Sequence, residues 1–397
     1  MYWAHAHKVL NGTMVTSSDL KAKFGNLFGS GCKIYRAPGR VNLIGEHTDY
    51  NDGFVFPAPL AFSCWVGAAA RKDQRIVVYS ENFGETAEGD LTELQRGGSA
   101  KWAEYPLGVV WALQQAGYAL RGANIYIRGE VPLGAGLSSS AAIEVAVGLA
   151  LSDISGHSIE RTRLALLCQK AENDFVGARC GIMDQFVSCN GRSGHALLLD
   201  CRSLEHQDVP LASEIQLVLC NTMVKHDIAV GGYNVRRAEC EEGTRKLSAV
   251  LPNVSALRDV SLEQLEEHRG LLTETVFRRC HHIITENGRV LAAVAALRAG
   301  DHQKFGELMG ESHRSLRDDF QVSCEELDLM VDLAMKQKGG YGARMTGGGF
   351  GGCTVNLVNR TDAPEFKEKV RESYFAATGR KPDIYLCEIG EGASLEA

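Results

Sequence analysis

One stretch of the chain, VPLGAGLSSSAA (131–142), constrains the fold more than any other. It follows a strand-like segment (124–131) and precedes an apolar segment with helical spacing (139–151). Glycines at a strand-to-helix join allow a ligand to approach the backbone, and a helix N-terminus presents unpaired N–H groups and a partial positive charge. The stretch therefore predicts an anion-binding loop, and we expect the anion to be a polyphosphate.

Other interpretations of this loop stay open. The nucleotide loop G-x-x-x-x-G-K-[ST] would carry a lysine, whereas GAGLSSSAA has none, so the chain is not an ordinary P-loop ATPase. A serine of this loop could cap the helix or bind a metal ion. A plain capped helix start after a glycine turn explains the stretch equally well when it is considered alone.

A second stretch, APGRVNLIGEHTDYNDGF (37–54), places four hydrogen-bonding side chains in a row between two apolar strands: Glu46, His47, Thr48 and Asp49. Such a density of donors and acceptors suits a sugar, although an exposed polar turn is the simpler explanation for the turn alone. Arg40 precedes a run of apolar residues, where a charge needs a partner.

A third stretch, CGIMDQF (180–186), supplies a candidate partner. Asp184 lies among Ile182, Met183 and Phe186, and a buried carboxylate is costly unless it is paired. It could cap the helix that begins there, or it could act as a base or orienting group with Arg40.

The pattern of elements favours an α+β fold. Strands and helices mix without a regular βαβ rhythm, and 397 residues are enough for two domains. We expect an N-terminal domain over 1–205 and a C-terminal domain over 206–397. Expected strands are 34–45, 53–70, 124–131, 195–200, 215–221, 353–358 and 383–389; expected helices are 102–117, 139–151, 160–177, 181–188, 235–250, 262–268, 275–299, 301–317, 325–337 and 364–378.

Composition excludes several classes of partner. The formal net charge of −7 argues against nucleic acid and acidic membranes. The twelve cysteines are scattered without a C-x-x-C pair, which favours buried thiols in a reducing compartment. No apolar run reaches the length of a membrane span, and the N-terminus lacks the pattern of a signal peptide. We expect a cytoplasmic protein; its oligomeric state is open, with a monomer favoured.

Together these stretches resemble the galactokinases, within the kinase superfamily named for galactose, homoserine, mevalonate and phosphomevalonate. GRVNLIGEHTDYNDG is similar to the galactokinase signature, VPLGAGLSSSAA to the phosphate loop and RMTGGGFGGC (344–353) to the third motif. CGIMDQF and GGYNVRR (231–237) also match family segments. The resemblance implies the two-domain α+β fold with its active site between the domains. It also implies ATP-dependent phosphorylation of the 1-hydroxyl of D-galactose to α-D-galactose 1-phosphate, with Mg²⁺.

The resemblance also implies roles for individual residues. Asp184 corresponds to the catalytic aspartate and Arg40 to the arginine near it, while Trp102 resembles the adenine-side tryptophan. Ser140 and Glu172 correspond to magnesium contacts, although Ser139 could be the serine used. The sugar ligands would be Glu46, His47, Thr48, Asp49, Gly181 and Tyr233, and the phosphate loop Gly134, Ala135, Gly136, Leu137, Ser138, Ser139 and Ser140. Gly347, Gly348 and Gly349 either shape the loop beside the phosphates or are purely architectural.

A nearby cation favours the ionised form of Asp184, which makes it a weak base. We therefore expect Asp184 to accept a hydrogen bond from the sugar and to take its proton late; whether it is a true base stays open. Two rival functions remain. An N-acetylgalactosamine kinase is disfavoured by GEHTDYND and GGYNVRR. A transcriptional sensor that binds both ligands without turnover is disfavoured because Ala141, Ala142 and Asp184 are present.

Two further motifs receive structural interpretations. CHH (280–282) has metal-ligand chemistry but no second cluster at a useful spacing, so we expect a pair on a helix surface. The carboxylates of ESHRSLRDDF (311–320) are expected on a solvated helix face.

Overall fold

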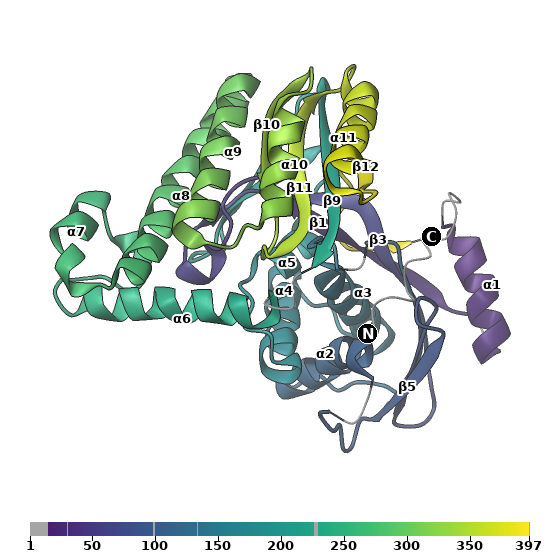
Figure 1. Cartoon of the computed structure of the whole chain (residues 1–397). Helices are drawn as coiled ribbons and strands as arrows, with labels where there is room; N and C mark the ends of the chain where they lie inside the picture. Colours follow the sequence, from purple (N-terminus) through teal and green to yellow (C-terminus); the bar gives the residue numbers. More distant parts are fainter. Residues whose placement is uncertain (1–14, 30, 98–99, 133, 226–228, 397) are drawn as a thin grey trace.

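The structure is a computed structural model that describes residues 15–29, 31–97, 100–132, 134–225 and 229–396. The expectation about a signal peptide concerns the first fourteen residues, which lie outside this range. Figure 1 shows two sheets at different heights, with a helical extension formed by α6, α7 and α8 at one side. Strands and helices mix as the α+β prediction requires.

The first sheet has six strands in the order β13-β1-β3-β6-β4-β5. β1 lies between β3 and β13 and pairs antiparallel with both, so strands from opposite ends of the chain are neighbours. The strands are β1 (Lys33–Asn42), β3 (Pro57–Ala70), β4 (Arg75–Ser80), β5 (Glu85–Asp90), β6 (Ala123–Gly129) and β13 (Ser394–Glu396).

Helix α3 covers this sheet by packing on β1 and β3, and α2, α4 and α5 pack against α3. Because α3 lies between a sheet and other helices, it is apolar around most of its circumference. The helices of this part are α1 (Ser17–Phe28), α2 (Glu104–Gln115), α3 (Ser139–Ile154), α4 (Arg161–Lys170) and α5 (Met183–Asn190), with the short helices η1 (Asp49–Asn51) and η2 (Lys101–Ala103) and the π-helical turn η3 (Ala171–Val176).

The second sheet has four strands in the order β10-β11-β9-β12. Helices α10 and α11 pack on it, α9 packs on β10, and α8 packs on α9. The strands are β9 (Ile215–Lys225), β10 (Gly340–Met345), β11 (Gly351–Asn359) and β12 (Asp383–Cys387); a third, three-stranded sheet contains β2 (Phe54–Val55), β7 (His195–Asp200) and β8 (His206–Pro210).

The remaining helices belong to the C-terminal half, where α6 and α7 pack on α8. They are α6 (Ala229–Ser248), η4 (Leu257–Asp259), α7 (Leu262–Glu267), η5 (Arg269–Leu271), α8 (Glu274–Arg298), α9 (His302–Ser315), the π-helical turn η6 (Leu316–Phe320), α10 (Glu325–Met335) and α11 (Ala363–Thr378). The largest buried cluster joins Val41 and Val145 of the first half to Leu217 and Val355 of the second, so the two halves share a continuous core.

Most expected elements are present, with some shifts of their ends. The strand expected over 34–45 ends at Asn42, and the helices expected over 160–177 and 301–317 each finish as a π-helical turn. Six elements were not predicted from the sequence: α1, β4, β5, β8, β10 and β13. The proposed division at 205/206 falls in the turn between the paired strands β7 and β8, and β13 returns to the first sheet, so the division stays a proposal.

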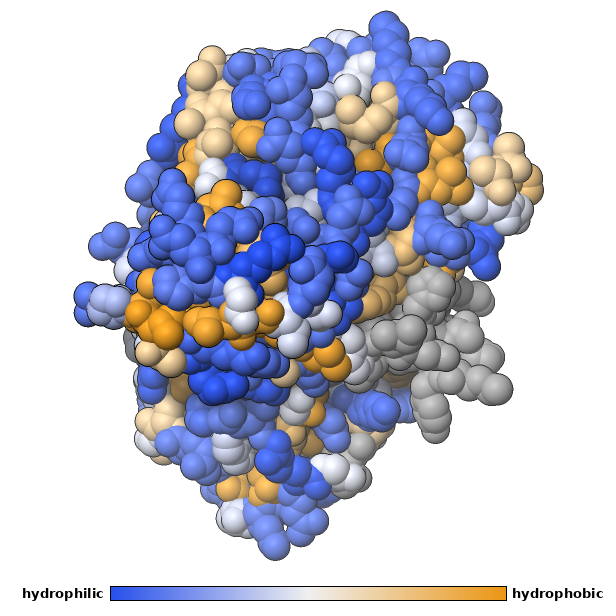
Figure 2. Space-filling model, turned by 60° about the vertical axis from the view of Figure 1, so that its left-hand side comes forward, coloured by the Kyte–Doolittle hydropathy of each residue, from blue (hydrophilic) through white to orange (hydrophobic). Residues whose placement is uncertain are grey.

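Among the described residues, none of the helices is both long and apolar enough to cross a bilayer. Figure 2 shows a face that is mostly hydrophilic with separate apolar patches.

Candidate active site

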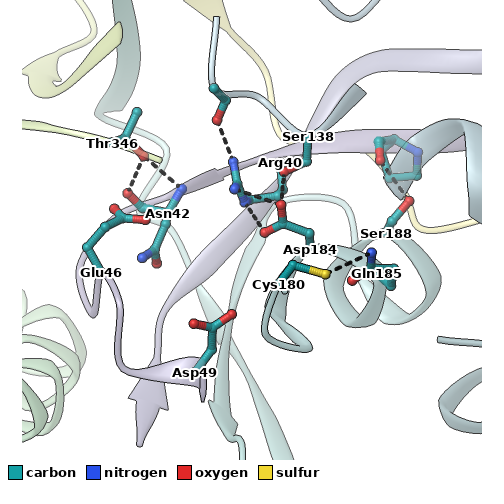
Figure 3. A network of polar contacts seen from close by, with 12 residues as sticks. Arg40, Asn42, Glu46, Asp49, Ser138, Cys180, Asp184, Gln185, Ser188 and Thr346 are labelled. Atoms are coloured by element: carbon teal, nitrogen blue, oxygen red, sulfur yellow. Dashed lines mark hydrogen bonds and ion pairs between the residues drawn. The ribbon is translucent and has the colours of Figure 1, made fainter. Parts of the chain in front are cut away.

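An ion pair between Arg40 and Asp184 lies at the centre of the site (Figure 3). Arg40 Nε donates to Asp184 Oδ1 at 2.7 Å and Nη2 donates to Oδ2 at 2.9 Å, which is a bidentate pair. Arg40 is only 5% exposed, so it requires this partner. Asp184 of CGIMDQF is therefore the partner that the buried Arg40 was expected to need. Asp184 does not cap helix α5, whose N-cap residue is Ile182.

A bulge in β1 helps to place Arg40. The register between β1 and β3 shifts between Pro38 and Arg40, and such bulges redirect a side chain. Gly39 allows the strand to approach the glycine loop, because a Cβ there would lie 2.6 Å from the carbonyl oxygen of Leu137. Arg40 N–H then donates to that carbonyl at 3.1 Å, and Arg40 Nη1 donates to the carbonyl of Gly136 at 2.6 Å.

The glycine loop has the backbone that its sequence predicts. Gly134, Gly136 and Ser138 all have positive φ, while Ala135 and Leu137 anchor the loop in the core. Helix α3 begins at Ser139. Ser138 occupies the N-cap position without a capping bond, and its hydroxyl instead donates to Asp184 Oδ2. This contact excludes the capping alternative for Ser138 and joins the loop to the ion pair.

The third glycine motif packs directly on this loop. A Cβ on Gly347 would lie 3.0 Å from the carbonyl oxygen of Gly136, and one on Gly348 would lie 3.6 Å from the Tyr233 ring. Gly349 has a φ of +84° and a Cβ there would lie 2.2 Å from the carbonyl oxygen of Val322. Gly347 therefore lies beside the loop, whereas close packing explains Gly349.

The polar turn of the second stretch holds its side chains by different contacts. Buried Glu46 pairs with Arg344, whose Nη2 donates to Oε2 at 2.7 Å. Burial raises the pKa of Glu46, although Arg344 and Arg40 oppose this. Thr48 Oγ1 donates to the carbonyls of Gly45 and Phe54 at 2.9 and 2.6 Å, so this hydroxyl holds the turn together.

Asp49 and Gly181 are in direct contact. A Cβ on Gly181 would lie 2.0 Å from Asp49 Oδ2, so only glycine leaves room for this carboxylate. Burial, and after it the carboxylate of Asp184, raises the pKa of Asp49 to about 7. Figure 3 shows Asp49 approaching the region of Asp184 from a different segment.

Aromatic rings form one wall beside these carboxylates. Tyr233 of α6 lies 5.5 Å from the His47 ring and 5.4 Å from the Tyr50 ring, between ring centres. His47 Nδ1 lies 2.9 Å from the Tyr50 hydroxyl, and the His47 Nε2 atom is buried with no hydrogen-bond partner among the described residues. Burial lowers the pKa of His47 well below its ordinary value, which keeps the ring neutral.

Glu172 and Ser140 are in contact and lie near Asp184. Glu172 lies in the π-helical turn η3 and accepts hydrogen bonds from Ser140 and from Gln185, the latter at 2.6 Å. Such turns often occur at functional sites. Burial, followed by Asp184, raises the pKa of Glu172 to about 7. Gln185 also donates to Glu144 at 3.0 Å, and the second carboxylate oxygen of Glu144 is buried without a hydrogen-bond partner in the described part of the chain.

Trp102 packs away from this centre. Its Nε1 donates to Glu85 at 2.9 Å and its ring stacks on Phe83 at 5.9 Å between ring centres. Both partners belong to the β4–β5 region at the edge of the first sheet. The expected role of Trp102 near adenine therefore stays a proposal.

Some residues of the site were not predicted, and one prediction was wrong. The sequence did not lead us to predict three polar residues of the site: Arg344, Glu144 and Gln185. Each could have been found as a charged or polar residue inside an apolar segment or a motif. CHH is not a surface pair, because His282 is completely buried and its Nε2 lies 3.1 Å from the Glu46 carbonyl oxygen. The carboxylates of 311–320 were expected on a solvated helix face. Asp318 is exposed as expected, whereas Asp319 is half-buried and contacts His281.

Comparisons with known proteins agree with this geometry. The profile of the GHMP kinases N terminal domain matches residues 104–192, that of the GHMP kinases C terminal matches 293–376, and the galactokinase galactose-binding signature matches 22–70. A mevalonate kinase structure shares the fold, with a TM-score of 0.63 at 18% identity over 90% of this chain and 98% of that one. The fold and the motifs place the chain among the GHMP kinases, which confirms the expected two-domain α+β fold.

Closer relatives define the family. The galactokinase of Roseiflexus sp. (strain RS-1) is 45% identical over 380 residues, which covers 96% of this chain and 97% of that protein. The galactokinase of Chloroflexus aggregans (strain MD-66 / DSM 9485) is 46% identical over 382 residues, covering 96% and 98%. The structure of Lactococcus lactis galactokinase complexed with galactose has a TM-score of 0.91 at 38% identity, covering 95% and 99%. The chain belongs to the galactokinase family, and its activity is the ATP-dependent phosphorylation of galactose.

Proposed function

We propose that the enzyme transfers the γ-phosphoryl group of ATP to the anomeric 1-hydroxyl of D-galactose and releases α-D-galactose 1-phosphate and ADP. The observation that supports this most directly is the position of the Arg40–Asp184 pair. Arg40 bonds the carbonyl of Gly136 in the glycine loop, and Asp184 lies near Asp49 of the polar turn. The pair therefore lies between an anion-binding loop and a turn suited to sugar hydroxyls.

Phosphoryl transfer has a loose transition state, so positioning and charge stabilisation supply most of the catalysis. In this proposal the N–H groups of the loop from Gly134 to Ser140 hold the phosphates, and Arg40 stabilises charge on the transferring group. The bond between the galactose 1-oxygen and the γ-phosphorus forms as the bond from that phosphorus to the β-phosphate oxygen breaks. The hydroxyl proton passes to the Asp184 carboxylate.

Asp184 acts first as an orienting group in this scheme. Arg40 and Ser138 both donate to its carboxylate, and these contacts fix the direction of the carboxylate. It therefore accepts a hydrogen bond from the 1-hydroxyl and takes the proton when the hydroxyl has become acidic. Glu46, His47, Asp49 and Tyr233 surround the other hydroxyls, and Thr48 and Gly181 shape the turn that presents them.

Ser140 and Glu172 fit a magnesium ion. Mg²⁺ prefers oxygen ligands and usually takes only one or two carboxylates from the protein. The buried Glu172 carboxylate, the Ser140 hydroxyl and the unpartnered oxygen of Glu144 supply such a donor set. No group of three or more His, Cys, Asp or Glu among the described residues is arranged to hold a metal without further ligands. When bound, the ion would neutralise phosphate charge. Ser140 is the better candidate than Ser139 because it contacts Glu172.

We also infer a cytoplasmic enzyme that acts as a monomer on two small-molecule substrates, D-galactose and Mg-ATP. All twelve cysteines lie in the described part of the chain and are free thiols, which fits a reducing compartment.

The test is release of ADP from Mg-ATP with D-galactose, N-acetylgalactosamine, glucose or no sugar, with NMR to locate the phosphate. Release with galactose and phosphate on the 1-position are the expected results. Release with N-acetylgalactosamine and little with galactose would assign the other sugar. Galactose binding without release would favour the sensor.

A further inference from the structure

One face of α8 contacts the polar turn at three points, although the two segments are more than 230 residues apart in the sequence. His282 Nε2 lies 3.1 Å from the Glu46 carbonyl oxygen, and the N–H of Gly45 donates to Glu286 Oε1 at 2.9 Å. The N–H of Phe54 donates to Asn287 Oδ1 at 2.8 Å. Two of these bonds hold the beginning of the turn, at Gly45 and Glu46, and the third holds its end at Phe54.

The turn needs such support because its backbone is unusual. Gly45, His47 and Asp52 have φ values of +96°, +65° and +56°. Residues other than glycine adopt such values at an energetic cost and keep them only where the surroundings enforce them. The bond from His282 reaches the peptide group that joins Glu46 to His47, and therefore acts at the most demanding position of the turn.

Each of the three α8 side chains is itself fixed. Burial lowers the pKa of His282 to about 4, so the ring is neutral; because a carbonyl only accepts, the ring proton is on Nε2. Its Nδ1 lies 2.9 Å from the Ser315 hydroxyl, which donates to Asp319 Oδ2 at 2.9 Å, so the ring is held from both sides. Arg289 and Ser312 donate to Glu286, both at 2.6 Å. Asn287 donates to the Ile283 carbonyl of its own helix at 3.1 Å.

We propose that His282, Glu286 and Asn287 are positioning residues for galactose, because they hold the turn that presents Glu46, His47 and Asp49. None of the three touches the reacting atoms; they act through the backbone of the turn. The inference rests on the proposed function. It means that α8 contributes to galactose affinity indirectly, by holding the turn in place. The phosphate loop makes no part of these contacts, so ATP binding should be unaffected.

The test compares His282→Phe, which keeps a ring and removes the donor, with His282→Gln, which keeps a donor at a similar distance. Galactose Kd is measured by calorimetry, KM for both substrates by ADP release, and Tm by calorimetric unfolding. An unpaired buried carbonyl should raise the galactose Kd and KM of His282→Phe about tenfold. Its KM for ATP should stay within about twofold, and His282→Gln should recover most of the affinity.

Asn287→Ala provides a second variant, with the same expected change, in case His282→Phe does not fold. Thr285→Ala is the matched control, since Thr285 lies on α8 and its hydroxyl, within the part of the chain that the structure describes, bonds the carbonyls of His281 and His282 in its own helix. Folded variants with galactose Kd unchanged, or with KM for both substrates raised equally, would overturn the inference. Absence of galactose binding by the unmodified enzyme would instead count against the proposed function.

Discussion

The contact between Gly181 and Asp49 leads to a prediction about the substitution Gly181→Ala. The added Cβ would lie 2.0 Å from Asp49 Oδ2 and 2.2 Å from its carboxyl carbon, whereas Cβ contacts below 3.0 Å essentially never occur. The carboxylate must therefore retreat by about 1 Å, and a displacement of this size at a reacting site costs about a hundredfold in rate. That loss corresponds to about 2.7 kcal/mol of transition-state stabilisation.

The assay for Gly181→Ala is steady-state ADP release with galactose and ATP varied in turn. We expect kcat/KM for galactose to fall about a hundredfold, while the KM for ATP and Tm change little, because φ at Gly181 is not in the left-handed region. Gly288→Ala is the control, since a Cβ there would meet nothing within 4 Å. If kcat/KM for galactose in Gly181→Ala stays within about twofold of the unmodified enzyme, the assignment of Asp49 to the sugar is refuted.

Three further predictions concern the carboxylates. Asp184→Asn keeps an oxygen that accepts from Arg40 but loses its charge, so it should fold and bind galactose yet lose most turnover; near-normal kcat would exclude an essential base. Glu172→Ala should raise the Mg²⁺ concentration for half-maximal rate with galactose KM unchanged, and an unaltered magnesium titration would remove Glu172 from the metal site. Because the pKa of Asp49 is raised to about 7 and the ionised form accepts from hydroxyls, galactose affinity should increase with pH up to about 7. Between about pH 4 and 7, Asp49 keeps its proton in the folded state but has lost it in the unfolded state. The free energy of unfolding of the ligand-free protein should therefore decrease as the pH rises from about 4 to about 7. Asp49→Asn should flatten the affinity profile and reduce the fall in stability, to which Glu172 also contributes because its pKa is likewise raised to about 7; unchanged profiles in this variant would contradict the raised pKa of Asp49.

Local sequence was sufficient to predict much of the site. The glycine loop, the polar turn and CGIMDQF are each contiguous, and their chemistry is visible in a few neighbouring residues. The pairing of Arg40 with Asp184 could also be predicted, because each is a charge in an apolar setting that requires a partner. The bidentate geometry and the contact with Ser138 required the structure.

Contacts between distant segments could not be predicted in this way. His282 and Glu286 lie on a long helix, and nothing within α8 indicates that its polar face meets a turn near residue 46. Arg344 is the first residue of the third glycine motif and carries no local sign of its partner Glu46. Among the missed strands, β5 is largely polar, β10 contains two glycines and β13 has three residues, so none has a clear alternation of apolar residues.

The pairing of β13 with β1 has a consequence for how the chain assembles. Arg36 of β1 lies opposite Ser394, so this ladder joins residues separated by more than 350 positions. Contacts of such long range form late, since the intervening chain must first be ordered. Until then, one edge of β1 offers unpaired N–H and C=O groups to any other strand, a recognised route to aggregation. The strand that carries Arg40 therefore keeps one unpaired edge until β13 has paired with it.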